Sequence, residues 1–106
     1  MNKYSFKINK RIIGLNYKPF IVAEMSGNHN GSLERALKII DKAAACGADA
    51  IKLQTYTADT MTMNLESKEF SVTDQQSIWK NKKLYDLYDK AHTPWKWHRK
   101  LFKHAK

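Results

Sequence analysis

Cysteine is almost missing from this sequence, which holds one, Cys46, in 106 residues. A single cysteine excludes an internal disulfide framework and favours a reducing compartment such as the cytosol. No apolar run approaches the ~20 residues of a membrane span, and the charged start MNKYSFKINK has no apolar core typical of a signal peptide. We therefore expect a soluble, cytoplasmic protein without a membrane partner, in which Cys46 packs as a small apolar residue.

Acidic residues are also scarce, with 10 Asp and Glu against 19 Lys and Arg and a formal net charge of +9. Such a charge attracts nucleic acid, acidic lipid or an anionic substrate without choosing among them. The segment TPWKWHRKLFKHAK mixes aromatic and basic residues, as a nucleic-acid surface does. We interpret its apolar stripe as packing and its remainder as solvated surface, including His92, His98 and His104, so we expect no nucleic-acid partner. The stripe consists of Trp97, Leu101 and Phe102.

Hydrophobic periodicity predicts a β-hairpin followed by a strand, a helix and a second strand. Polar and apolar residues alternate over residues 3–16 around a turn at Asn9-Lys10. The run FIVAEM is typical of a strand buried on both faces of a parallel sheet. SLERALKIIDKAAACG predicts an amphipathic helix between Ser32 as N-cap and Gly47, and ADAIKLQTY predicts the second strand. Such a βαβ unit should have parallel strands.

Residues 56–80 show no sustained period, and so long a connection is usually functional or mobile. Helical spacing returns in KKLYDLYDKAH, and Thr93-Pro94 indicates the N-cap and first residue of a final helix. Parallel strands need cover on both faces and neighbours on both edges. We therefore expect residues 1–106 to be the N-terminal piece of a larger α/β protein, with a hairpin in 1–18 and the first βα units in 19–106.

Polar residues stand where the two predicted strands end. Glu24 ends the first strand, and Lys52 and Gln54 end the second. The carboxyl ends of parallel strands open on one mouth, so these side chains should meet there. An ammonium beside a carboxylate suits a small phosphorylated or carboxylated substrate, because one group binds the anion and the other handles a proton or hydroxyl. The alternative is a buried Glu–Lys ion pair without a ligand.

The loop in AEMSGNHNGS is rich in glycine and in polar side chains. Gly27 and Gly31 permit positive φ or close backbone approach, and Asn28, His29 and Asn30 offer donors and acceptors before a helix N-terminus. The loop can cradle an anion, or it can be turn and capping chemistry. Neither GxxxxGK[ST] nor GxGxxG occurs, and His29 has no second ligand nearby, so we predict no metal site within this chain.

Two motifs together resemble the N-terminal part of the sialic acid synthase family. They are AEMSGNHNGSLERALKIIDKAAACGADAIKLQTYTADTMT and LYDLYDKAHTPWKWH, and the resemblance covers roughly residues 19–105. It implies an α/β fold, the N-terminal fragment of a (β/α)₈ TIM barrel with about two βα units. The hairpin would be a plug beneath the barrel. A complete barrel needs roughly 250 residues, so the rest of it is expected to be absent here.

The resemblance also implies a synthase that forms a carbon–carbon bond. Members condense phosphoenolpyruvate with an amino sugar, release phosphate and use a divalent metal such as Mn²⁺, whose ligands are not expected in this chain. The full-length protein is implied to be a homodimer. By this resemblance Glu24 and Lys52 are catalytic, with Lys52 holding the phosphoenolpyruvate anion. The implied substrate-binding residues are Asn28, His29, Gln54, Thr55 and Tyr56, and a sugar-binding loop follows from Tyr56 onward.

Within the family, TYTADTMT and TPWKWH favour the pseudaminic acid branch, whose acceptor is a 2,4-diacetamido-2,4,6-trideoxy-altrose. A fragment of an N-acetylneuraminate or legionaminate synthase is the alternative within the family. A non-catalytic basic module that binds an anionic partner is the alternative from another class. We expect the 106 residues alone to be inactive and marginally stable.

Overall fold

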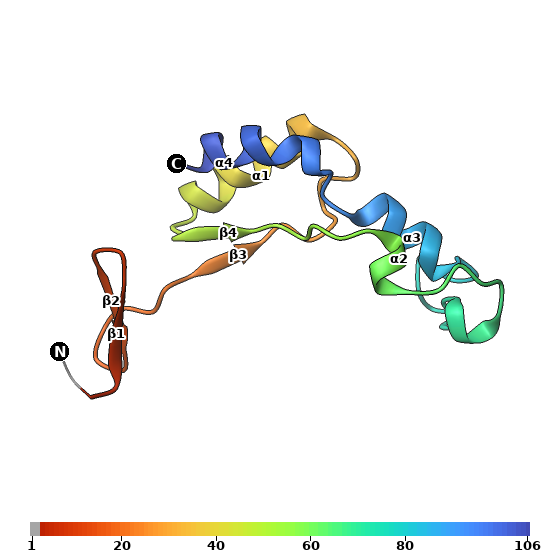
Figure 1. Ribbon diagram of the computed structural model, residues 1–106, viewed down its shortest axis with the longest axis horizontal. Helices are drawn as coiled ribbons and strands as arrows, with labels where there is room; N and C mark the ends of the chain where they lie inside the picture. Colours follow the sequence, from red (N-terminus) through yellow and green to blue (C-terminus); the bar gives the residue numbers. More distant parts are fainter. Residues whose placement is uncertain (1–2) are drawn as a thin grey trace.

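The computed structural model describes residues 3–106 of the chain. The chain forms an extended, bent molecule of 53 × 33 × 25 Å. Figure 1 shows the N-terminal hairpin at one end, a central unit of two strands and two helices, and an irregular arm at the other end. Within residues 3–106, none of the helices combines the length and apolar character that crossing a bilayer requires.

The N-terminal hairpin is confirmed. β1 (Ser5–Ile8) pairs antiparallel with β2 (Arg11–Gly14), and Asn9 in the turn has a left-handed φ of 53°, which asparagine tolerates. The hairpin is tied to the central unit by Arg11, whose guanidinium pairs with Asp49 and donates to the Pro19 carbonyl at 2.9 Å. The Ile21 N–H and then Arg11 hold the pKa of Asp49 below its ordinary value.

The central strand, helix and strand are also confirmed. β3 (Val22–Glu24) and β4 (Ala50–Lys52) are parallel, and α1 (Leu33–Ala45) connects them. The Ser32 side chain caps α1 by accepting from the Arg35 N–H at 3.2 Å. Gly47 follows the helix with a φ of 88°, a conformation that glycine adopts without steric cost.

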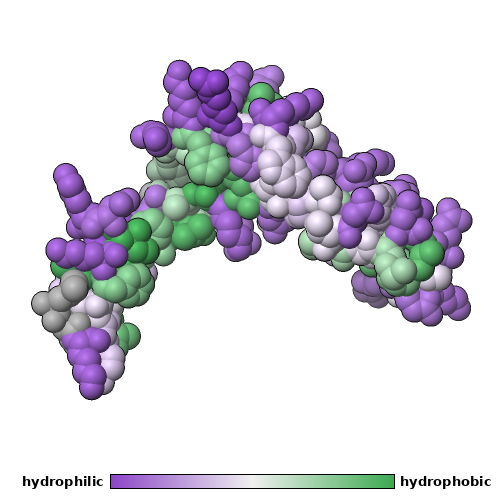
Figure 2. All heavy atoms as spheres, in the orientation of Figure 1, coloured by the Kyte–Doolittle hydropathy of each residue, from purple (hydrophilic) through white to green (hydrophobic). Residues whose placement is uncertain are grey.

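The core lies between α1, α4 (His98–Ala105) and one face of the two-stranded sheet (Figure 1). Its buried members are Met25, Ala36, Ile40, Trp97 and Leu101. Figure 2 shows hydrophilic residues over the helices and hydrophobic residues gathered over the strands beneath them. Within residues 3–106 no helix covers the opposite face, so Val22 is 46% exposed and the expected burial of the first strand on both faces is wrong for this chain.

The irregular arm follows β4. It contains α2 (Ala58–Met61) and a 3₁₀ turn, η1 (Lys68–Phe70), and an isolated bridge joins Ser71 to Lys83. The chain then returns as α3 (Leu84–Ala91), which packs against α2. The helix in KKLYDLYDKAH and the lack of long regular structure in residues 56–80 were both predicted correctly.

The start of the last helix differs from the prediction. Thr93 does not cap a helix that begins at Pro94, because Thr93 is fully buried and its backbone N–H donates to the Gln54 carbonyl at 2.8 Å. Pro94 is extended, with φ −60° and ψ 134°, and a 3₁₀ turn, η2 (Trp95–Trp97), precedes α4. The contact with the end of β4 therefore delays the α-helix until His98.

Two packing predictions also fail. Phe102 was placed on the packed stripe with Trp97 and Leu101, but it is 60% exposed. Phe102 is rotated by about 100° from Leu101 around α4, so its side chain points outside the face that packs against α1. Cys46 is exposed rather than packed, because it is the C-cap of α1, beyond the last turn that the core covers.

Candidate functional site

Glu24 and Lys52 meet where the two parallel strands end, and we call them the strand-end pair. They occupy the same rung of the β3–β4 ladder, which places their side chains next to each other. The Lys52 Nζ lies 2.6 Å from the Glu24 Oε1, and the two side chains are 54% and 53% exposed. The structure thus brings both residues together as the sequence predicted, and their ion pair is open to solvent rather than buried.

An exposed ion pair of this kind is free to exchange partners. Pairs in solvent contribute only about 0–1 kcal/mol to stability. Separating Lys52 from Glu24 therefore costs little, and an incoming anion can take over the ammonium. The carboxylate is then released beside the bound anion, where it can accept a proton and return it afterwards.

The loop after β3 uses much of its polar chemistry to build turns. The Asn28 side-chain amide donates to the Met25 carbonyl at 2.9 Å, and backbone bonds join Asn28 to Met25, Asn30 to Gly27 and Ser32 to His29. Left-handed φ angles occur at Ser26, Asn30 and Gly31. These contacts support the turn and capping interpretation of NHNG, although Asn28 itself is exposed.

His29 lies behind this loop with no exposed surface. Its Nδ1 accepts from the Gly31 N–H at 3.0 Å, so the neutral ring carries its proton on Nε2. The ring meets Trp97 edge to face, with centroids 5.1 Å apart. Burial lowers the pKa of His29, the Ala91 backbone partly opposes this, and His92 adds a smaller lowering. His29 is therefore a buried side chain, held between the Gly31 N–H and the Trp97 ring, and its neutral form is favoured.

Gly27 brings the same loop against the end of α3. A Cβ at this position would lie 3.0 Å from the Ala91 Cβ and 3.2 Å from the Ala91 carbonyl oxygen. Any side chain here would push the loop away from α3. The absence of a Cβ thus sets the position of the loop that follows Glu24.

The segment after β4 contacts the end of α3 and the residues that follow that helix. The Gln54 carbonyl accepts from the Thr93 N–H, and the Thr55 Oγ1 lies 2.6 Å from the His98 Nε2. The Tyr56 ring contacts Tyr88 at 5.8 Å and His92 at 6.3 Å between centroids. Burial raises the pKa of Tyr56, and electrostatic repulsion between the ionised forms of Tyr56 and Tyr88 raises it further.

Residues 88–98 therefore support both strand-end loops, and we call them the support segment. The predicted role of His92 and His98 as solvated surface is wrong, because both are half-buried and contact the residues after β4. The prediction compared them on one helix, whereas the chain turns between them at residues 92–94. For His98, the sequence signal that could have indicated its burial was its position beside Trp97 in TPWKWH. His104 is exposed and pairs with Asp41 at 2.7 Å.

The described residues do not fit a divalent metal. Among residues 3–106, no three or more His, Cys, Asp or Glu side chains lie together as a group that could hold an ion. The strand-end pair supplies one carboxylate whose nearest partner is an ammonium, which repels a cation. We therefore assign no chemical step of these residues to a metal.

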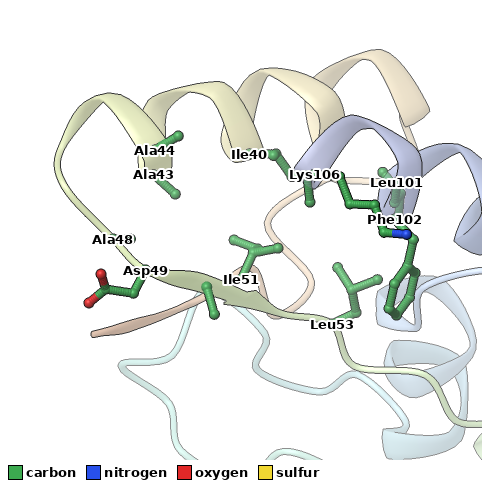
Figure 3. Close-up of a pocket in the computed structure, with 12 residues that line it drawn as sticks. Ile40, Ala43, Ala44, Ala48, Asp49, Ile51, Leu53, Leu101, Phe102 and Lys106 are labelled. Atoms are coloured by element: carbon green, nitrogen blue, oxygen red, sulfur yellow. The ribbon is translucent and has the colours of Figure 1, made fainter. Parts of the chain in front are cut away.

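An apolar groove lies between α1, α4 and the edge of β4, away from the strand-end pair. Figure 3 shows Ile40, Ile51, Leu53 and Leu101 along it, with the exposed ring of Phe102 at one side. Its volume is about 280 Å³, and Asp49 and Lys106 are its charged residues. An aliphatic lining offers few groups for chemistry, so we place the candidate site at the strand-end pair instead.

Parallel strands with helices on one face, and an ammonium and a carboxylate at their carboxyl ends, are the arrangement of a βα-type fold with a candidate site at its strand ends. Residues 39–106 match the NeuB family, and the chain belongs to it. It is 50% identical over 88 residues to the pseudaminic acid synthase of Campylobacter jejuni serotype O:2, covering 83% of this chain and 25% of that protein. It is also 50% identical over 42 residues to the N,N'-diacetyllegionaminic acid synthase of Legionella pneumophila, covering 40% of this chain and 12% of that protein.

The fold agrees with the family. The crystal structure of the N-acetylneuraminic acid synthetase of Leptospira borgpetersenii matches 98% of this chain and 32% of that one, with a TM-score of 0.73 and 27% identity. This confirms the predicted α/β class and its likeness to sialic acid synthases. The chain spans about a quarter of the length of the pseudaminic acid synthases that it matches.

Proposed function

We propose that this chain provides the first βα units of a synthase that condenses phosphoenolpyruvate with a 2,4-diacetamido-2,4,6-trideoxy-altrose to give pseudaminic acid and phosphate. In this reaction C3 of the enolpyruvyl group attacks the open-chain aldehyde of the sugar, which forms the new carbon–carbon bond. Water adds to C2, and the C2–O bond to phosphate breaks. The sugar, phosphoenolpyruvate and water account for every atom of the two products.

In this proposal Lys52 binds the phosphoenolpyruvate anion as a point charge. Glu24, released from its ion pair, stands beside the anion and handles a proton at the sugar. Asn28, Gln54 and Tyr56 border the same mouth, and residues 56–80 provide contacts to the sugar. Residues 3–18 form the plug of a TIM barrel whose further strands, metal ligands for an ion such as Mn²⁺ and dimer contacts lie outside this chain. The reaction takes place in the cytoplasm.

The observation that carries the proposal is the position of the strand-end pair. Its two groups are of the kind that an anionic substrate and a proton transfer require, and they meet in solvent at the carboxyl ends of parallel strands. The choice of pseudaminic acid rests on the 50% identity to the Campylobacter jejuni enzyme over most of the chain. The legionaminic acid synthase, similar over a shorter stretch, makes that product the alternative.

A chimera tests the proposal. The 88 aligned residues of this chain would replace their counterparts in the Campylobacter jejuni pseudaminic acid synthase. Phosphate release from phosphoenolpyruvate would be measured with Mn²⁺ and either the altrose-type acceptor or the acceptor of the legionaminic acid synthase. We expect release with the altrose-type acceptor and none from the 106-residue chain by itself.

Two variants of the chimera serve as controls. Lys52→Met should abolish release because it removes the anion-binding charge while keeping the aliphatic stem. Lys42→Met makes the same change on the exposed face of α1 and should leave release unchanged. A folded chimera that is inactive, or one that prefers the other acceptor, would contradict the assignment to pseudaminic acid.

A further inference from the structure

His98 makes two hydrogen bonds that fix both its tautomer and its partner. Its Nδ1 lies 3.0 Å from the Trp95 carbonyl oxygen, and its Nε2 lies 2.6 Å from the Thr55 Oγ1. A carbonyl oxygen only accepts, so Nδ1 carries the proton in the neutral ring. Nε2 is then an acceptor, and the Thr55 hydroxyl must donate to it. The orientation of the Thr55 side chain is thereby determined by a residue 43 positions away.

The ring of His98 is also held in place by its neighbours. Its centroid lies 6.4 Å from that of Trp95 and 6.0 Å from that of Phe102, with the second pair stacked. One residue before Thr55, the Gln54 carbonyl accepts from the Thr93 N–H at 2.8 Å. Two consecutive residues after β4 are thus bonded to the support segment, one by backbone and one by side chain.

The side from which Thr55 is held follows from the alternation of the strand. Ile51 and Leu53 pack against the core beneath the helices, and Lys52 points to the opposite face with Glu24. β4 ends at Lys52, and we infer that the alternation continues beyond it, with Thr55 on the side of Ile51 and Leu53 and Gln54 on the side of Lys52. Thr55 therefore contacts the helix layer, which its bond to His98 in α4 agrees with.

We propose that His98 is a positioning residue of the candidate site, which acts through the Thr55 hydroxyl to hold the end of β4 so that Lys52 and Gln54 face the substrate. Thr55 is then a link behind the site and not a substrate contact. This inference rests on the proposed synthase function. It adds that the binding of the anionic substrate depends on a hydrogen bond on the far side of the strand.

The kinetic test uses the active chimera with Thr55→Val and His98→Phe. Valine keeps the shape of threonine without the hydroxyl, and phenylalanine keeps the ring packing without the nitrogens. Each variant should raise the KM for phosphoenolpyruvate about fivefold, as expected when the ~1 kcal/mol of one hydrogen bond is expressed at the site. Because Thr55→Val removes only a bond that His98→Phe has already removed, the double variant should be no worse than His98→Phe alone.

Thr55→Ser restores the hydroxyl and should restore the KM. His104→Phe, the same change as His98→Phe at an exposed position of α4, is the matched control and should leave the KM unchanged. A purely structural role for the bond would lower the fraction of folded enzyme and hence kcat, without changing the KM of the active molecules. An unchanged KM in Thr55→Val and His98→Phe would overturn the proposal while the activity of the parent chimera still supports the proposed function.

A second measurement does not depend on activity. Hydrogen exchange of the Thr93 amide, which bonds to the Gln54 carbonyl, can be followed by NMR in the 106-residue chain. Thr55→Val and His98→Phe should accelerate this exchange about fivefold, and His104→Phe should not. At pH 8, where an ordinary imidazole is neutral, nitrogen shifts should show the Nδ1–H tautomer of His98. Unaltered exchange in both variants, or the Nε2–H tautomer, would disprove the link even if the chimera is inactive.

Discussion

Replacing Gly27 by alanine should destabilise the chain through one identifiable contact. The new Cβ would lie 3.0 Å from the Ala91 Cβ and 3.2 Å from the Ala91 carbonyl oxygen, closer than ordinary packing allows. The φ of Gly27 lies outside the left-handed region, so alanine would gain about 0.4–1 kcal/mol from a less flexible unfolded chain. Overpacking costs about 1–3 kcal/mol. We therefore expect a net loss of about 1–2 kcal/mol.

A double-mutant cycle with Ala91→Gly isolates this contact. By itself Ala91→Gly should cost up to about 1 kcal/mol, because glycine is a poor helix former and Ala91 is the last residue of α3. In the Gly27→Ala background it should recover part of the loss, because it removes one of the two overlapping atoms. Urea unfolding followed by circular dichroism on the four proteins would give a coupling energy of about 1 kcal/mol in favour of the double variant.

The result that refutes this reasoning is additivity. If the two changes sum to within about 0.3 kcal/mol, the loop and the end of α3 do not share a contact that limits the approach. If Gly27→Ala stabilises the chain, the loop can move away from α3 at no cost. In both cases the position of the residues after Glu24 would not depend on the support segment.

Three further predictions concern other parts of the molecule. Leu101→Ala should lower the free energy of unfolding by about 2–5 kcal/mol, since Leu101 is 1% exposed in the small core, and urea unfolding would show it as a near-complete loss of folded chain. Glu24→Gln should change the free energy of unfolding by less than about 1 kcal/mol, because the pair that it breaks is in solvent. Burial lowers the pKa of His29 below its ordinary 6.5, so the unfolded chain takes up the proton first as the pH falls through that value. The contribution of His29 to stability is then fully present above the unfolded pKa and is lost as the pH falls from it to the lower folded pKa. The free energy of unfolding, measured from pH 8 to pH 5, should therefore depend less on pH in His29→Gln.

Much of the fold could be predicted because the relevant signals are local. The turn at Asn9-Lys10, the Ser32 cap and the glycine after α1 each act within a few residues, and all lie where the sequence placed them. The start of α4 was misplaced because it depends on a bond from Thr93 to Gln54, 39 positions earlier. Capping rules describe a helix end by its own residues, so they miss a contact of this kind.

The geometry of the candidate site was predicted to a similar depth. The pairing of Glu24 with Lys52 follows from the parallel register, which alternation and strand order fix. The burial of His29 does not follow from the sequence of its loop, because its ring packs against Trp97, which is distant in the sequence. The half-buried state of His92 and His98 likewise requires the turn between α3 and α4. The residues behind the site were thus the least predictable ones, since each is placed by a contact between distant segments.

The strand-end pair is better explained by ligand binding than by folding. The register is already set by the rungs that pair Val22 with Ala50 and Ala23 with Ile51, and a solvent-exposed ion pair adds at most about 1 kcal/mol. Two β-branched residues on the same rung would suit the strand at least as well. The pair therefore does little for the fold, although it occupies the place where loops of a βα fold converge. An ammonium that is held ready by a carboxylate, in solvent and at little cost to release, has the properties that a binding site for a small anion needs.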